Sequence, residues 1–278
     1  MSLNWDLPTT YKYILFVQKF VFDTLNKELN NLSVWFKINK LSLNIKKTNY
    51  ILFGGNNIMN NNSELFIDHN VIVKFHSSKF LGIIIDEKLK WQEHINAVAN
   101  KVSKSLGVIY KMKIALPVSK LPMLYSILIL LYYQYCNMVW DCNYHSNLHK
   151  LSVLQKRAIR IISAAEFRTR AADLFKRYRQ LTLADINKLQ IAIFEFKSLN
   201  NLLPSVFIDF MCNSELHHHF TRSANNLHTI RYNTNTRYFS MKVQIPPAWN
   251  DLDFKLRKIS HLSRFKRLVK DSLLSVYY

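Results

Sequence analysis

The stretch from Phe80 to His94 constrains the fold more than any other, because a strand pattern changes there into a helix pattern. Phe80, Leu81 and the isoleucines at 83–85 predict a short strand buried on both faces. Gly82 inside this run indicates a bulge or a close backbone approach. A helical stripe follows directly, at Ile95, Val98, Val102, Leu106 and Ile109. The chain is therefore expected to pass from a buried strand into a long amphipathic helix.

A second apolar stripe precedes this junction and predicts another helix, from about residue 18 to residue 38, ending at Asn39 and Lys40. Its members are Phe22, Leu25, Leu29, Leu32 and Phe36. Strand patterns follow at Tyr50–Phe53 and over residues 65–75, with a turn at Asp68–Asn70. The predicted fold class is α+β and mostly α, with a small antiparallel sheet followed by helices.

Positive charge dominates the chain, since 38 Lys and Arg against 18 Asp and Glu give a net charge of +20. Such an excess favours a polyanionic partner, either nucleic acid or an anionic membrane surface. The stretch from Lys150 to Arg179 concentrates it, with only Glu166 and Asp173 as acids. Its cations are Lys150, Lys156, Arg157, Arg160, Arg168, Arg170, Lys176, Arg177 and Arg179.

Within this stretch, Lys156 and Arg160 are four residues apart and share one helical face. The opposite, apolar face is expected to hold Leu154, Ala158, Ile161 and Ile162. The basic face predicts contacts with nucleic-acid phosphates, for which arginine is the stronger ligand. A solvated charged face is the alternative that the sequence leaves open.

The tail from Phe254 to Lys270 is also basic, with an apolar stripe after Ser260 as the expected N-cap. Its cations are Lys255, Arg257, Lys258, Arg264, Lys266, Arg267 and Lys270. A second nucleic-acid contact and a simple docking helix explain this pattern equally well.

Residues Leu121–Trp140 form an apolar segment close to the length of a membrane span. Pro122, Ser126, Gln134 and Asn137 argue against a span. A core helix is the preferred interpretation. Its aromatic residues are then expected in the core rather than stacked on bases: Tyr132, Tyr133, Tyr135 and Trp140.

Cysteine and histidine usage favours neither a disulfide framework nor a metal centre. Three cysteines are too few and too scattered for a framework, which favours a reducing, intracellular location, nuclear or cytoplasmic. The set Cys136, Cys142, His145 and His149 has wider cysteine spacing than zinc sites use. No metal site is predicted, and the N-terminus lacks the pattern of a secretory signal.

Two segments carry a resemblance to a known family. WFKINKLSLNIKKTNYILF at 35–53 and KFLGIIIDEKLKWQEHI at 79–95 resemble the end of the reverse transcriptase domain of non-LTR retrotransposons, of the jockey/CR1 kind. The length and spacing of the pair make the pattern specific. The resemblance continues through LQKRAIRII at 154–162 and PPAWNDL at 246–252.

The resemblance implies a palm remnant at residues 1–90, a helical thumb at 91–180 and a basic C-terminal region at 181–278. Phe80, Leu81 and Gly82 would belong to the primer grip, and Lys47 would match a lysine near the leaving pyrophosphate. The implied partners are RNA and DNA, without a membrane partner, and the oligomeric state stays open. The expected nucleic-acid contacts of the basic helix and its continuation are Lys156, Arg157, Arg160, Arg168 and Arg170.

The family's catalytic carboxylates have no counterpart here. An adjacent aspartate pair would precede Leu15 and Phe16, but residues 10–13 are Thr-Tyr-Lys-Tyr, and no Asp-Asp occurs in the chain. Phosphoryl transfer in this family needs Mg²⁺ held by such carboxylates. We therefore expect a 5′-truncated copy that binds primer–template without catalysis or a cofactor. Two alternatives are a reverse transcriptase completed by separate palm and fingers, and a membrane-associated protein that uses Leu121–Trp140.

Overall fold

The computed structural model describes residues 21–53, 64–204, 207 and 226–277, and the chain forms two compact units, Met1–Lys90 and Trp91–Tyr278. The fold is α+β and mostly α, as the sequence predicts. Residues 91–180 and 181–278, predicted as separate domains, both belong to the second unit. Residues 10–16, where the family would place its aspartate pair, lie outside the described ranges.

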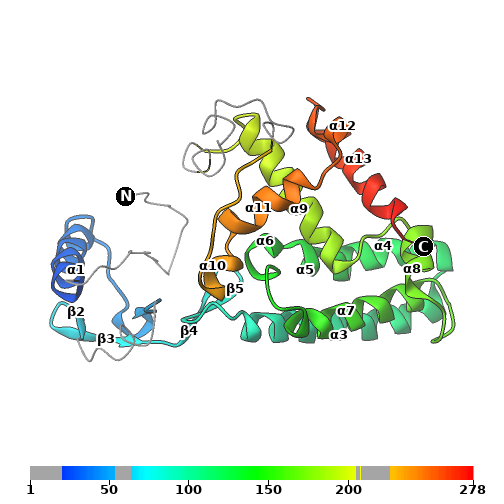
Figure 1. The fold of residues 1–278 in the computed structure, drawn as a ribbon. Coiled ribbons are helices and arrows are strands. Elements are labelled where there is room, and N and C mark those ends of the chain that lie inside the picture. Colours follow the sequence, from blue (N-terminus) through cyan, green and yellow to red (C-terminus); the bar gives the residue numbers. More distant parts are fainter. Residues whose placement is uncertain (1–20, 54–63, 205–206, 208–225, 278) are drawn as a thin grey trace, which may run out of the picture. The chain divides into compact units, whose positions relative to one another are not determined.

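In the first unit, helix α1 (Val21–Ile38) covers one face of a three-stranded sheet (Figure 1). The strands are β1 (Asn49–Tyr50), β2 (Leu65–Ile67) and β3 (Asn70–Lys74), in the order β1–β3–β2, and the turn η1 (Ile45–Lys47) precedes β1. Leu65, Ile67 and Ile72 are buried under the apolar stripe of α1, which confirms that stripe. Lys40, with a φ of 53°, ends the helix as predicted.

Two details of this sheet differ from the prediction. It is mixed rather than antiparallel, because β1 runs parallel to β3 while β2 runs antiparallel to it. The strand predicted at Tyr50–Phe53 is confined to Asn49–Tyr50. The reason is that β3 ends at Lys74, so the residues after Tyr50 have no neighbouring strand to pair with. The last bond of this pairing runs from Phe75 N–H to the Tyr50 carbonyl.

The single strand predicted over Phe80–Ile85 is wrong, because this stretch is a two-stranded hairpin. Strand β4 (Ser77–Phe80) pairs antiparallel with β5 (Ile83–Asp86), and Phe80 lies opposite Ile83. Leu81 and Gly82 form the turn between them, with φ values of 45° and 85°. Two consecutive positive φ values are the signature of tight hairpin turns. The hairpin is not buried on both faces either, since Leu81 is 65% exposed.

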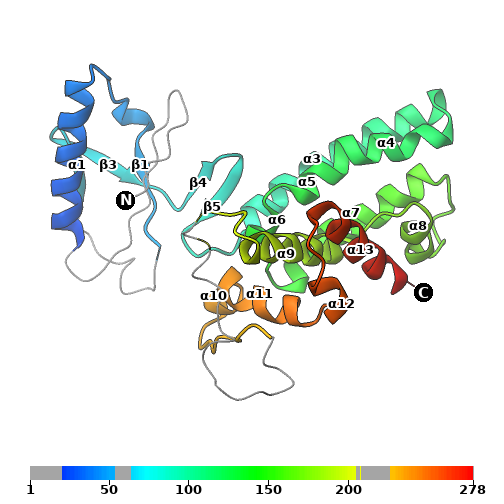
Figure 2. The same cartoon turned by 90° about the horizontal axis from the view of Figure 1, so that it is seen from above.

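The second unit begins with the long helix α3 (Gln92–Ala115), and the predicted stripe from Ile95 to Ile109 is buried. Figure 2 shows α3 beside α7 (His145–Ile162), against which that stripe packs. After the turn η2 (Val118–Lys120), the chain returns along α3 as α4 (Leu121–Tyr125), the π-helical stretch η3 (Ser126–Leu130) and α5 (Leu131–Gln134).

The apolar segment Leu121–Trp140 is thus not one continuous helix. After α5 the chain bends at Cys136, whose φ is 49°, and α6 (Asn137–Trp140) follows. In the described ranges, no helix combines the length and the apolar character needed to cross a membrane. Tyr133 and Trp140 are fully buried as predicted, whereas Tyr135 is 51% exposed, which contradicts its expected core position.

Helix α9 (Leu183–Leu199) packs against α5, α6 and α7 on one side and against α11 (Met241–Asn250) and α13 (Leu262–Ser275) on the other. Short helices α8 (Ala171–Arg177), α10 (Asn235–Tyr238) and α12 (Phe254–Arg257) complete the unit. The N-cap of α13 is His261, whose carbonyl accepts from Phe265 N–H at 2.9 Å. Ser260, the predicted N-cap, therefore lies one residue too early.

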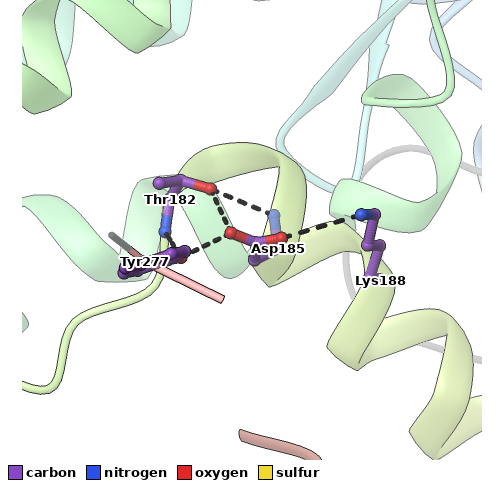
Figure 3. A network of polar contacts seen from close by, with 4 residues as sticks. All are labelled: Thr182, Asp185, Lys188 and Tyr277. Atoms are coloured by element: carbon purple, nitrogen blue, oxygen red, sulfur yellow. Dashed lines mark hydrogen bonds and ion pairs between the residues drawn. The ribbon is translucent and has the colours of Figure 1, made fainter. Parts of the chain in front are cut away.

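A polar cluster fastens the C-terminus to the start of α9 (Figure 3). Thr182 Oγ1 caps the helix by accepting from the backbone N–H of Asp185, and it donates to the Asp185 carboxylate at 2.6 Å. The Tyr277 hydroxyl also donates to this carboxylate and accepts from Thr182 N–H at 2.9 Å. Lys188 Nζ lies 3.8 Å from the other carboxylate oxygen. Because a helix start leaves backbone N–H groups without partners, this cluster stabilises both segments.

Candidate nucleic-acid interface

Helix α7 carries the first part of the predicted interface on the side that faces away from the core. Lys156 and Arg157 are exposed, while Ala158 and Ile162 are fully buried, as the helical spacing predicts. Leu154 and Ile161, predicted on the apolar face, are only half-buried, because that face is centred on Leu151, Gln155, Ala158, Ile159 and Ile162. The orientation of α7 therefore presents its lysine and arginine to solvent.

Gln155, on the buried face of α7, fixes this orientation. Its amide nitrogen donates to the Tyr125 hydroxyl at 3.1 Å and to the Leu181 carbonyl at 3.0 Å. Its amide oxygen accepts from Leu183 N–H at 2.8 Å. One buried side chain thus joins α4, α7 and the segment that leads into α9. An unmade hydrogen bond in such a site is costly, so the network resists rotation of α7.

A tight turn ends α7, and Arg168 and Arg170 lie on the short segment between this turn and α8. Ala164 has a φ of 53°, and its N–H donates to the Ile161 carbonyl while Ala165 N–H donates to the Arg160 carbonyl. This pair of bonds is the Schellman ending of a helix, in which a left-handed residue satisfies the last carbonyls. Both arginines are exposed on the segment that leads into α8.

Arg160 differs from the other predicted contacts, because its side chain holds this turn together. Its Nε donates to the Thr169 carbonyl at 3.0 Å, and its guanidinium carbon lies 5.8 Å from the centre of the Phe167 ring. Such an arrangement combines a charge-assisted hydrogen bond with a cation–π contact. Arg160 is half-buried, so its first role is to order the segment that carries Arg168 and Arg170.

Helix α8 extends the positive surface and ends in a second Schellman turn, with Arg179 as its left-handed residue at a φ of 49°. Arg179 pairs with Asp271 of α13. Burial lowers the pKa of the neighbouring Lys270, and the positive charge of Arg179 lowers it further. A contact across 92 residues of sequence leaves no signal in local patterns, so the sequence did not predict that α13 borders this surface.

These residues form what we call the α7–α8 basic surface: Lys156, Arg157, Arg160, Arg168, Arg170, Lys176, Arg177 and Arg179. In the described part of the chain, no ion pair joins Lys156, Arg157, Arg168 or Arg170 to a carboxylate. The surface can therefore offer several uncompensated cations to one polyanion.

The other predicted contacts belong to the first unit. Phe80 is half-buried beside the hairpin turn, and Leu81 and Gly82 are exposed at its tip. Lys47 is exposed at the end of η1, where its backbone N–H donates to the carbonyl and side chain of Asn44. Leu81 and Gly82 thus lie on the hairpin turn, Phe80 ends strand β4 before it, and Lys47 ends η1. These four residues belong to the first unit, whereas the α7–α8 basic surface belongs to the second.

Among the described residues, no group of three His, Cys, Asp or Glu side chains could hold a metal ion. Burial raises the pKa of the Cys142 thiol to about 11, with a smaller contribution from Asp141. Because metals bind the thiolate, this shift makes Cys142 a poor ligand at neutral pH.

Comparisons with protein-family models, curated protein sequences and solved structures find no match to this chain.

Proposed function

We propose that this chain is a C-terminal part of a non-LTR retrotransposon reverse transcriptase, and that it binds primer–template nucleic acid without polymerising on its own. One observation carries the binding proposal: the α7–α8 basic surface gathers eight cations on a packed helical framework, with two acids in the same stretch. The family assignment has its support in the motif pair at 35–53 and 79–95.

The geometry of the surface favours contacts with phosphates over contacts with bases. Lys156 and Arg157 stand on the outer side of a helix, and Arg168 and Arg170 stand on the short segment after it. Exposed lysine and arginine side chains at such spacing can follow a charged backbone, and these contacts carry no sequence information. Binding should therefore be strong in low salt and nearly independent of sequence.

The β4–β5 hairpin would provide a second contact, at Phe80, Leu81 and Gly82. A leucine in the left-handed conformation is unfavourable, and yet Leu81 is exposed at the tip instead of contributing to a core. An apolar side chain held out on a tight turn suits contact with the end of a nucleic-acid strand. Lys47 would lie in the palm remnant that the family resemblance implies.

The experiment is a salt titration of binding to a short DNA duplex. The wild-type affinity should fall steeply with salt, and Lys156→Ala/Arg157→Ala should lower the slope of log K against log salt by about two, at roughly 0.9 per phosphate contact. The matched control is Lys104→Ala/Lys111→Ala, which removes the same charge from exposed positions on α3 and should leave the slope nearly unchanged. Arg160 is kept, because it orders the neighbouring turn.

Equal slopes for the wild type and the Lys156→Ala/Arg157→Ala variant would refute the interface, since those charges would then be only a solvated face. Catalysis is tested separately, by primer extension on an RNA template with Mg²⁺ or Mn²⁺. The chain alone should incorporate no nucleotide, because no adjacent aspartate pair is present to hold the metal ions. Metal-dependent incorporation by the purified chain would contradict the absence of catalysis.

A further inference from the structure

The helical hairpin of α3 with α4, η3 and α5 exposes a row of large apolar side chains on its outer side. We call Met123, Ile127, Leu131 and Tyr135 the apolar row, and they are 63%, 49%, 58% and 51% exposed. The opposite side of the same helices is fully buried, at Tyr125, Ile129 and Tyr133. Exposed apolar residues are ordinary when scattered, but a continuous row marks an interaction surface.

The π-helical stretch Ser126–Leu130 keeps this row in line. In an α-helix, positions four residues apart drift around the axis by about 40° at each step, so a long row would wind away from one side. A π-helical stretch turns less per residue and cancels part of this drift. Met123 and Leu131, on either side of η3, are therefore both able to meet one flat partner.

Lysines border the apolar row. Lys101 of α3 places its Nζ 5.5 Å from the centre of the Tyr132 ring, so this side of α3 adjoins the row. By helical spacing, the same side of α3 carries Lys104, Val108 and Lys111, all exposed. From His94 to Trp140 the chain has five lysines and no Asp, Glu or Arg. The face is therefore apolar along its middle, and on its α3 side the charged residues that border it are lysines.

We propose that this face docks on the surface of an anionic lipid bilayer without crossing it. Aliphatic side chains enter the boundary between headgroups and acyl chains, while lysine stems lie along it with their ammonium groups at the phosphates. This docking departs from the expected absence of a membrane partner and is closer to the alternative of a membrane-associated protein that uses Leu121–Trp140, but without a span.

Two other occupants fit the face less well. A second copy would place its lysines against the same lysines, with no acid on either side to compensate them. Nucleic acid would meet methionine, isoleucine and leucine, which neither stack well on bases nor donate to phosphates. An anionic bilayer satisfies both parts of the face at once.

The test is flotation of the full chain with phosphatidylcholine vesicles, alone or with one third phosphatidylserine, at physiological salt. The chain should float only with the anionic vesicles. Ile127→Glu should reduce flotation to the level of neutral vesicles, whereas Val153→Glu, at a residue 48% exposed on α7, should not. Lys104→Ala/Lys111→Ala should weaken vesicle binding by about 30-fold, at about 1 kcal/mol for each lysine.

Circular dichroism of each variant should match the wild type, because every substituted side chain is exposed. Failure of the wild type to float with anionic vesicles would overturn the proposal, and so would equal losses in Ile127→Glu and Val153→Glu. If the wild type does not bind vesicles but forms a dimer, and Ile127→Glu dissociates that dimer, the face would be assigned to a second copy instead. If the wild type does not bind vesicles and Ile127→Glu loses binding to a DNA duplex, the face would be assigned to nucleic acid.

Discussion

Glu195 lies in α9 with no exposed surface, and neither of its carboxyl oxygens has a hydrogen-bond partner among the described residues. Burial raises the pKa of this carboxyl to about 8, so the folded chain keeps it protonated at pH 7. In the unfolded chain the same group has its ordinary pKa of 4.5. Folding therefore binds a proton at neutral pH, and the stability of the second unit depends on pH.

The sign follows from where the proton is held. Because the pKa is higher in the folded state, the contribution of Glu195 to stability is greatest below pH 4.5 and decreases until about pH 8. At about 1.4 kcal/mol for each pH unit, the decrease between pH 5 and pH 7 is about 2.5 kcal/mol. Asp141, whose pKa is raised to about 7 by burial, contributes in the same direction.

Glu195→Gln should remove the Glu195 contribution, since glutamine is neutral at every pH and has nearly the same shape. Urea denaturation at pH 5 and pH 7 should show that the wild type loses about 2.5 kcal/mol more unfolding free energy than Glu195→Gln does over this interval. Glu166→Gln, at an exposed carboxyl, is the matched control and should follow the wild type. Parallel pH dependence in the wild type and Glu195→Gln would refute the reasoning.

Two further substitutions test the framework of the α7–α8 basic surface. Gln155→Met keeps the side-chain volume but leaves the Leu181 carbonyl and Leu183 N–H without partners, so urea denaturation should show a loss of about 2 to 4 kcal/mol. An unchanged unfolding midpoint would mean that this network does not hold α7. Ala164→Gly relieves the left-handed conformation after α7 and should stabilise the chain by about 1 kcal/mol, seen as a higher melting temperature. A lower melting temperature would show that unfolded-state entropy outweighs the relief.

Apolar periodicity predicted the parts of the fold that depend on burial alone. The sequence predicts the stripes of α1 and α3, because one face of each helix is buried: that of α1 against the sheet, and that of α3 against α7 and the returning segment of α4, η3 and α5. Backbone reversals that rest on unfavourable residues were not predictable. Leu81 and Cys136 adopt positive φ values without glycine or asparagine at those positions. The sequence therefore predicts one strand where the chain forms a hairpin, and one helix where the segment bends.

The candidate site also has some features that the sequence predicts and others that it does not. The cations themselves and their sharing of one face of α7 could be predicted, because charge and helical spacing are local properties. Three features could not: the rotation of the buried face toward Gln155, the structural role of Arg160, and the approach of α13 to Arg179. Each depends on contacts between segments that are distant in sequence or on the course of a turn.

Arg160 shows why the charge and the shape of the α7–α8 basic surface cannot be treated as independent. Its guanidinium donates to Thr169 and lies against Phe167, so the cation that neighbours Lys156 and Arg157 also orders the segment that carries Arg168 and Arg170. A lysine there would keep the charge but lose the planar donor geometry and the stacking. A smaller nucleic-acid affinity after changing Arg160 would therefore report both a lost charge and a displaced pair of arginines. Lys156 and Arg157 make neither contact, so the affinity change after substituting them reports the lost charge alone.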